Sequence, residues 1–335
     1  MPHKTPKIIL GIANVGDPAD AAVRFDTSDK INALLDEFYA HGYRVLDSAR
    51  VYPPGKPGTA ETYLAAALRE SKTRGQHKTD PFVVDTKVWS NTPGSHTPDA
   101  IARSVDESVG LLGDVVSIDI EYLHQPDRTV PLAAALGALS AQLQQSKFQR
   151  IGISNYRVDE VDELVRIADE HGLEPPRVYQ GCYNAVSRDL EADLIPTLRK
   201  HGIALYAYSP TAGGLFSEQA KAVLPGSRYD PNMTFGAVYT GKYKTPAIEA
   251  AVQRVRDAAA AHQISGHAAA LRWIVHHSAL SGEHGDGVII GVSSVEQLRS
   301  SLDAIDAGPL PADVLAAVEA ISSSISDDEK QGFKF

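Results

Sequence analysis

Four residues in the first half of the chain carry side chains suited to acid–base chemistry: Asp47, Tyr52, Lys87 and His124. They supply a carboxylate, a phenol, an ammonium and an imidazole. A tyrosine has an ordinary pKa of about 10, so it is neutral at pH 7 but a weak acid. An ammonium within about 4–6 Å lowers the pKa of a phenol, because the opposite charge stabilises the phenolate. If Asp47 pairs with Lys87 and holds that ammonium beside Tyr52, the phenol becomes a usable proton donor.

These residues fall at comparable points of a repeating pattern. Short apolar runs alternate with amphipathic stretches, and continuous apolarity is typical of strands buried on both faces. Asp47, Lys87 and His124 stand at the carboxyl ends of the second, third and fourth runs, and Tyr52 follows Asp47 closely. We therefore expect the four side chains to meet at one end of a sheet. The predicted strands are 7–13, 43–49, 82–88, 116–124, 149–155, 177–184, 204–210 and 287–293.

Strands that alternate with helices fit either a closed barrel or an open doubly wound sheet. An open sheet that binds a dinucleotide carries G-x-G-x-x-G after its first strand, and this chain lacks that pattern. No shift in composition divides the chain. The sequence therefore predicts an α/β fold of the (β/α)8 TIM-barrel class, one domain over residues 1–335, with an extended loop and helices between strands 7 and 8. Barrel enzymes place their catalytic groups at the carboxyl ends of the strands.

Composition excludes several classes of function. The net charge of −10 argues against a general affinity for nucleic acid or for an anionic membrane. No apolar run approaches the ~20 residues that span a bilayer, and the single cysteine, Cys182, indicates a reducing compartment. We expect a cytoplasmic protein with no nucleic-acid or membrane partner. The adjacent His276 and His277 point to different sides of a helix, so with His284 they do not predict a metal site.

Five segments, in order along the chain, carry a more specific signal. They read D-S-A-R-V-Y at 47–52, T-K-V-W at 86–89, Y-L-H-Q-P-D at 122–127, I-G-I-S-N-Y at 151–156 and Y-S-P at 208–210. In this combination the chain resembles the aldo-keto reductase superfamily over nearly its whole length. Further segments are similar to the branch of aflatoxin-aldehyde and succinic-semialdehyde reductases: V-Y-Q-G at 178–181, A-G-G-L at 212–215 and S-S-V-E-Q-L at 293–298.

The resemblance implies that aldehydes, or alternatively ketones, are reduced to alcohols by hydride transfer from NADPH, with Tyr52 as general acid. Asp47 and Lys87 would support the phenol, and a neutral His124 would orient the carbonyl group. The nicotinamide carboxamide would contact Ser154, Asn155 and Gln180, and its ring would stack on Tyr208. The other cofactor contacts implied are Ser209, Pro210, Gly213, Gly214, Leu215, Arg228, Gly291, Ser293, Gln297 and Ser301.

The cofactor and substrate assignments have alternatives. Gln297 and Ser301 stand where many family members have Arg and Asn, so NADH is the alternative to NADPH. Trp89, Tyr243 and Phe335 are candidates for lining the substrate pocket, and residues 321–335 are a candidate tail that folds over the site. The expected partner is a small-molecule aldehyde. A homodimer is an option, because dimers occur in the resembled branch.

Two other functions compete with the reductase. A metal-dependent barrel hydrolase or lyase would use His124, Asp47 and Glu121, but strand alternation turns Glu121 away from His124. That function also leaves Tyr52 and Lys87 without a role. A regulatory subunit would bind the cofactor without turnover, as some relatives of these reductases do. The complete set of four acid–base residues favours catalysis.

Overall fold

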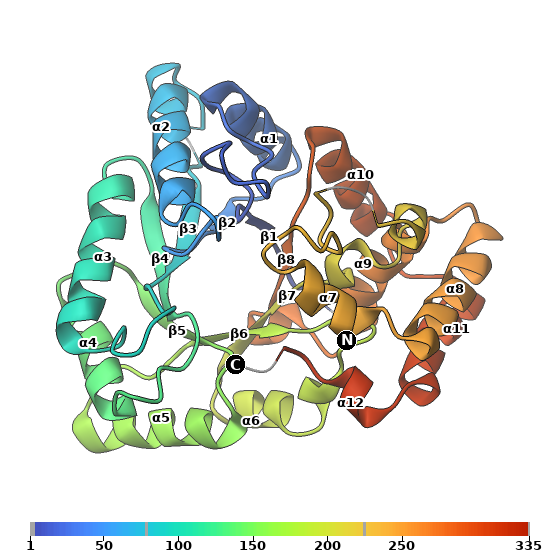
Figure 1. The fold of residues 1–335 in the computed structure, drawn as a ribbon. Coiled ribbons are helices and arrows are strands. Elements are labelled where there is room, and N and C mark those ends of the chain that lie inside the picture. The colour runs from blue at the N-terminus through green and yellow to red at the C-terminus, as the bar shows by residue number, and fades with distance from the viewer. Residues whose placement is uncertain (1–3, 78–79, 224–225, 334–335) are drawn as a thin grey trace.

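Eight parallel strands close into a barrel in which each strand pairs with the next along the chain and β8 pairs with β1 (Figure 1). The structure, a computed structural model, describes residues 4–77, 80–223 and 226–333. The closed barrel confirms the predicted fold class and excludes the open doubly wound sheet. The strands are β1 (Lys7–Gly11), β2 (Val45–Asp47), β3 (Val83–Lys87), β4 (Ser117–Leu123), β5 (Arg150–Ser154), β6 (Val178–Cys182), β7 (Ala204–Tyr208) and β8 (Gly287–Ile290).

Helices cover the outside of the barrel (Figure 1). They are α1 (Ser28–Ala40), α2 (Thr59–Thr73), α3 (Pro98–Leu112), α4 (Leu132–Gln144), α5 (Val158–His171), α6 (Leu194–Lys200), α7 (Gly236–Tyr243), α8 (Pro246–Ala260), α9 (Gly266–His276), α10 (Val295–Asp306), α11 (Ala312–Ser324) and α12 (Asp327–Lys330). Apolar residues at helical spacing form the inner, buried faces of the longer helices. In α5 the buried apolar residues include Val161, Leu164 and Ala168. No helix in the described ranges has the length and apolarity needed to cross a membrane.

The connection from β7 to β8 is the long one that the sequence predicts. It contains α7, α8 and α9 together with the 3₁₀ helices η2 (Ala212–Gly214), η3 (Glu218–Lys221) and η4 (Gly282–His284). Another 3₁₀ helix, η1 (Asp189–Glu191), precedes α6. The side chains of Thr245 and Ser265 accept hydrogen bonds from the first turns of α8 and α9, which fixes where these two helices begin. Helix α8 packs against α9 and α11, and Tyr243 at the end of α7 contacts Cys182 at the end of β6.

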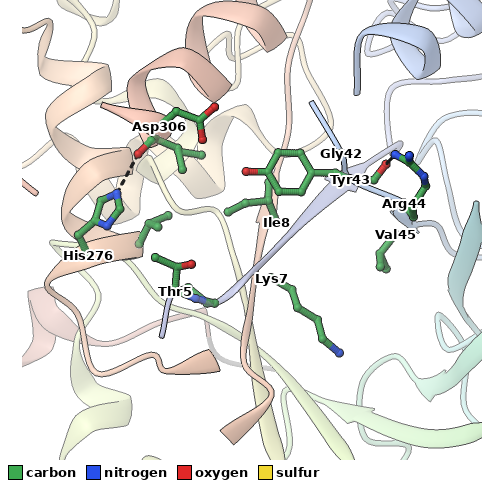
Figure 2. A pocket seen from close by; sticks show the side chains of 12 residues that line it. Thr5, Lys7, Ile8, Gly42, Tyr43, Arg44, Val45, His276 and Asp306 are labelled. Carbon is green, nitrogen blue, oxygen red and sulfur yellow. Dashed lines mark hydrogen bonds between the residues drawn. The ribbon is translucent and has the colours of Figure 1, made fainter. Parts of the chain in front are cut away.

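The interior of the barrel is a packed core. Its apolar cluster consists of Ile9, Ile120, Tyr122, Val178, Ala204, Tyr206 and Ile289. A cavity of about 390 Å³ lies at the opposite end of the strands from the predicted site. Figure 2 shows the side chains that line it. Lys7, Tyr43 and Val45, near the starts of β1 and β2, line this cavity together with His276 and Asp306. Barrel enzymes use the other end, so this cavity is not the candidate active site.

Candidate active site

The carboxyl ends of β2, β3 and β4 bring the four predicted acid–base residues together. Asp47 ends β2, Lys87 ends β3, and His124 directly follows β4. Tyr52 lies in the loop between β2 and α2. Its ring is perpendicular to the imidazole of His124, with 5.6 Å between the ring centroids, and Lys87 Nζ lies 5.0 Å from the centre of the Tyr52 ring. Residues far apart in the sequence thus form one cluster.

The ammonium of Lys87 is surrounded by acceptors. Lys87 Nζ donates to Asp47 Oδ1 and Oδ2 at 2.8 and 2.9 Å and to the backbone carbonyl of Ser48 at 2.7 Å. Both charged side chains are buried. Burial works against the charge on Lys87, but Asp47 and then Tyr52 outweigh it, so the pKa of Lys87 is raised. The lysine therefore remains an ammonium at neutral pH.

Opposing influences act on the Tyr52 phenol. Burial is the largest and raises the pKa of Tyr52, the ammonium of Lys87 lowers it, and the carboxylate of Asp47 raises it. The net pKa lies above the ordinary value of 10.0, whereas the sequence alone predicts a lowered one. The two directions of the pKa shift differ because they rest on different information. The effect of the Lys87 charge can be expected from the residue types alone, whereas the loss of water around the phenol depends on how the loops fold. Tyr52 therefore holds its proton at neutral pH.

The imidazole of His124 is neutral in this environment. Burial is the largest cause and the ammonium of Lys87 the next, and both lower the pKa of His124 well below its usual range. A neutral imidazole donates one hydrogen bond and accepts another, but at pH 7 it carries no extra proton to give away. A neutral His124 and a protonated Tyr52 thus lie side by side at the barrel mouth.

The residues predicted to hold a carboxamide form a network that reaches the acid–base cluster. The Tyr208 hydroxyl donates to Asn155 Oδ1 at 2.9 Å, and Asn155 Nδ2 donates to Ser154 Oγ at 2.9 Å and to the His124 carbonyl at 3.1 Å. Gln180 Nε2 donates to Asp47 Oδ1 at 2.8 Å. The structure thus brings these four predicted residues together. It also shows a contact between Gln180 and Asp47 that the sequence does not predict.

A cavity of about 240 Å³ lies at the same end of the barrel, because its lining follows the carboxyl ends of β1, β7 and β8. The backbone φ values of Gly213 and Gly214, 66° and 85°, are left-handed values that glycine adopts without strain. In the same loop Pro210 and Leu215 are buried, and Ser209 Oγ lies 2.8 Å from the Tyr239 hydroxyl. The predicted cofactor residues that line the cavity are Gly213, Gly214, Arg228, Ser293 and Gln297.

Asn14 and Arg24 are among the residues of this cavity that sequence reasoning missed. Arg24 donates to the Gly226 carbonyl at 2.6 Å, and Asn14 Nδ2 donates to the Val292 carbonyl at 2.6 Å. These bonds tie the loop after β1 to the β7–β8 connection and to the loop after β8. Both residues follow the first predicted strand, at the end of the barrel where the loops converge, and that position is the signal that points to them.

Two of the predicted cofactor contacts, Gly291 and Ser301, do not line this cavity within the described part of the chain. Ser301 is buried, with its Oγ 3.3 Å from His267 Nε2. Gln297 Oε1 accepts a hydrogen bond from the backbone of Ser293 at 2.6 Å, which places this side chain over the start of α10.

Aromatic side chains form one wall of the barrel mouth. The ring of Phe333, from the C-terminal segment, lies 5.1 Å from the ring of Tyr239 and 6.1 Å from that of Tyr243, between centroids. Tyr243, a predicted pocket residue, is fully buried, and its hydroxyl accepts from Asn184 Nδ2 at 3.2 Å. Trp89 is partly buried beside α3. Phe335 lies outside the described residues.

The acidic residue proposed for a hydrolase faces elsewhere. Glu121 is fully buried on the outer side of the barrel wall, where its charge interacts with Glu61 of α2. Across residues 4–77, 80–223 and 226–333, no group of three His, Cys, Asp or Glu side chains is arranged to hold a metal ion. Glu121 therefore does not join Asp47 and His124 in one site.

A parallel barrel with a tyrosine, a lysine–aspartate pair and a neutral histidine at its mouth has the architecture of a barrel enzyme. The chain belongs to the aldo/keto reductase family, whose sequence model matches residues 7–323. It is 36% identical to an aldo-keto reductase of Pseudocercospora fijiensis over 85% of this chain and 95% of that protein. It is 34% identical to human aldo-keto reductase family 7 member A3 over 93% of this chain and 92% of the relative. Human aflatoxin B1 aldehyde reductase member 4 is 32% identical, with the same coverage of 93% and 92%. The protein is therefore an oxidoreductase.

Proposed function

We propose that the protein reduces small-molecule aldehydes to alcohols with NADPH and that Tyr52 is the proton donor. The observation that carries the proposal is the Lys87 ammonium, held by both oxygens of Asp47 and lying 5.0 Å from the Tyr52 ring. The ammonium lowers the pKa of Tyr52 and therefore stabilises the phenolate that proton donation produces.

Each residue of the cluster has a distinct role in this reaction. The cofactor, when bound, supplies a hydride to the carbonyl carbon. Tyr52 protonates the carbonyl oxygen, and Lys87 stabilises the phenolate that remains. Asp47 keeps the ammonium in place, and neutral His124 donates a hydrogen bond that orients the carbonyl group.

The mouth of the barrel suits a phosphorylated dinucleotide. Arg24 and Arg228 both line the cavity, and within the described residues neither forms an ion pair with a carboxylate. Two uncompensated guanidinium groups in a chain of net charge −10 favour an anionic ligand. Gly213 and Gly214 let the backbone approach phosphate oxygens closely. These features support NADPH, with its additional phosphate, over NADH.

The cellular location and the domain organisation of the protein belong to the same proposal. The buried, unpaired thiol of Cys182 supports a reducing compartment, the cytoplasm. We propose one domain over residues 1–335, with the C-terminal segment as part of the substrate site. The contact of Phe333 with Tyr239 supports that assignment.

The test follows the absorbance of the reduced cofactor in the presence of 4-nitrobenzaldehyde or succinic semialdehyde. Tyr52→Phe is expected to lower kcat by at least about 10²-fold, the usual contribution of a positioned general acid. Binding of NADPH, measured by quenching of protein fluorescence, is expected to persist. The matched control is Tyr43→Phe, which makes the same change at the opposite end of the barrel. Equal activity of wild type and Tyr52→Phe would exclude Tyr52 as the donor, and NADPH binding without turnover of any aldehyde would favour a regulatory subunit.

A further inference from the structure

A second acid, Asp85, lies beneath the acid–base cluster in the interior of the barrel. On β3 the Thr86 hydroxyl donates to Glu61 Oε1 of α2 at 2.6 Å, so Thr86 faces the helices. Strand alternation then turns its neighbours Asp85 and Lys87 toward the interior. Asp85 is also the register partner of Asp47 on β2. It therefore lies beside Asp47 and, two residues earlier on the same strand, beneath Lys87.

Asp85 has no accessible surface, and neither of its carboxyl oxygens has a hydrogen-bond partner among the described residues. Lys87 does not donate a hydrogen bond to Asp85, because its ammonium donates to the two oxygens of Asp47 and to the Ser48 carbonyl. The fully buried hydroxyl of Tyr122 in the same interior is likewise unpaired within the described chain. An isolated carboxylate is costly in such a place, whereas an uncharged acid is tolerated.

Other charged and titratable groups face Asp85 from the surrounding strands. Arg150 on β5 is committed to Asp119 on β4, with bonds of 2.6 and 3.0 Å. Lys7 on β1 lies 3.5 Å from the Tyr206 hydroxyl on β7, and it also lines the cavity in Figure 2. The remaining groups are Asp47 on β2, Lys87 on β3 and Tyr122 on β4. The cations near Asp85 thus already have partners.

The electrostatic balance agrees with this geometry. Burial, followed by the carboxylates of Asp119 and Asp47, raises the pKa of Asp85 well above its ordinary value. Arg150 and Lys87 oppose these effects with smaller contributions. Asp85 therefore keeps its proton to a higher pH than an exposed aspartate does.

We propose that Asp85 is a positioning residue of the reductase: an uncharged acid beneath Lys87, whose ionisation weakens Tyr52 as a proton donor. With Asp85 uncharged, the field of the ammonium acts on Asp47 and Tyr52 alone. With Asp85 ionised, Lys87 stands between two carboxylates and stabilises the Tyr52 phenolate less. This inference rests on the proposed role of Tyr52.

The first experiment compares the pH dependence of kcat/KM in wild type and Asp85→Asn. Wild type is expected to lose activity in two steps as pH rises: a first step when Asp85 ionises, with a pKa well above its ordinary value, and a second step when Tyr52 ionises, with a pKa above 10.0. The first step is expected to be at most about tenfold, since a shift of one pKa unit in the donor changes proton-transfer equilibrium by that factor. Asp85→Asn is expected to show only the Tyr52 step. Superimposable profiles would overturn the proposal.

Glu121→Gln is the matched control. Glu121 is equally buried and has no hydrogen-bond partner in the described chain, but it lies on the outer side of the barrel wall. Glu121→Gln also removes a buried carboxylic acid, but both steps in the pH dependence of kcat/KM are expected to remain. Loss of the first step in Glu121→Gln as well would mean that any buried acid produces it, which contradicts a specific role for Asp85.

Two spectroscopic measurements test the role of Asp85 without enzyme turnover. The infrared spectrum of wild type at neutral pH is expected to contain the carbonyl stretch of a protonated carboxylic acid that disappears in Asp85→Asn. An ultraviolet titration of tyrosinate, with Tyr52→Phe subtracted, is expected to place Tyr52 at a lower pKa in Asp85→Asn than in wild type. If wild type reduces no aldehyde, the proposed function fails, and these spectra still test Asp85. Absence of the acid band, or an unshifted Tyr52, would overturn the inference.

Discussion

The rings of Phe333 and Tyr208 lie parallel, at an angle of 8° with 6.4 Å between their centroids. Phe333 comes from the C-terminal segment and Tyr208 ends β7, so the tail reaches the aromatic residue on which we propose that the nicotinamide ring stacks. The tail is held by its own contacts: Lys242 donates to the Glu329 carbonyl at 2.6 Å, and Gly332 N donates to Asp189 Oδ1 at 3.0 Å. Phe333 is therefore presented to the barrel mouth by a fixed segment.

We expect Phe333→Ala to weaken binding of aromatic aldehydes more than that of aliphatic ones. Loss of an aromatic pair is worth about 0.5–1.5 kcal/mol, which predicts a rise in KM of roughly two- to twelvefold for 4-nitrobenzaldehyde. Phe235→Ala, which removes a phenylalanine that is 41% exposed, is the control and is expected to leave KM unchanged. An equal loss for succinic semialdehyde and 4-nitrobenzaldehyde would show that Phe333 does not contact the aromatic ring.

The Lys87–Asp47 pair predicts a coupled effect on activity and stability. Lys87→Met removes the ammonium and leaves a buried carboxylate without its partner, which typically destabilises a protein by about 3–5 kcal/mol. We expect loss of reductase activity together with a lower free energy of unfolding in denaturant titrations. The double variant Asp47→Asn/Lys87→Met removes the stranded charge, so it should recover stability but not activity. Recovery of activity in the double variant would contradict the role of the ammonium.

Much of this site could be predicted from strand ends. Asp47, Lys87 and His124 close apolar runs, and in a parallel barrel all such ends meet at one mouth, so residue type and position sufficed. The surroundings of Asp85 could not be predicted in this way, because Asp85 does not end an apolar run and its neighbours come from adjacent strands and from across the barrel. Their approach depends on register, including the shift in pairing between β3 and β4.

The residues of the long connections were harder to predict for a different physical reason. Tyr239 reaches the barrel mouth from α7, and Arg24 reaches it from the loop after β1. Tertiary contacts set the paths of both segments, such as the hydrogen bond from Arg24 to the Gly226 carbonyl. The pKa of Tyr52 was predicted in the wrong direction because burial is a property of the folded loops. The glycines at 213 and 214 were predictable, since positive φ in a tight loop favours glycine.

A buried histidine near the site makes stability depend on pH. Burial lowers the pKa of His96 to about 4, and its Nε2 lies 3.1 Å from Ser90 Oγ. Because the folded pKa lies below the unfolded value of about 6.5, the stabilisation is complete above pH 6.5 and is lost as pH falls toward 4. The difference corresponds to roughly 3 kcal/mol at pH 4. Denaturant titrations from pH 7 to pH 4 should show this loss in wild type and in the surface variant His284→Asn, and a smaller loss in His96→Asn. Parallel curves for wild type and His96→Asn would exclude His96 as the source.

The two guanidinium groups in the cofactor cavity predict how the protein distinguishes NADPH from NADH. Arg228→Leu removes a cation that has no carboxylate partner in the described chain, and a lost hydrogen bond to a charged group typically weakens binding by about 1.5–3 kcal/mol. We expect Kd for NADPH, from fluorescence quenching, to rise by roughly ten- to a hundredfold, and Arg24→Leu to act in the same direction. Arg254→Leu on α8, where the side chain contacts Ser324, is the control.

Comparison of the two cofactors shows which phosphate the arginines bind. If Kd for NADH rises by the same factor, these arginines bind the phosphates that both cofactors share; a larger rise for NADPH assigns them to its additional phosphate. An unchanged Kd for both cofactors in both variants would contradict a cofactor site in this cavity.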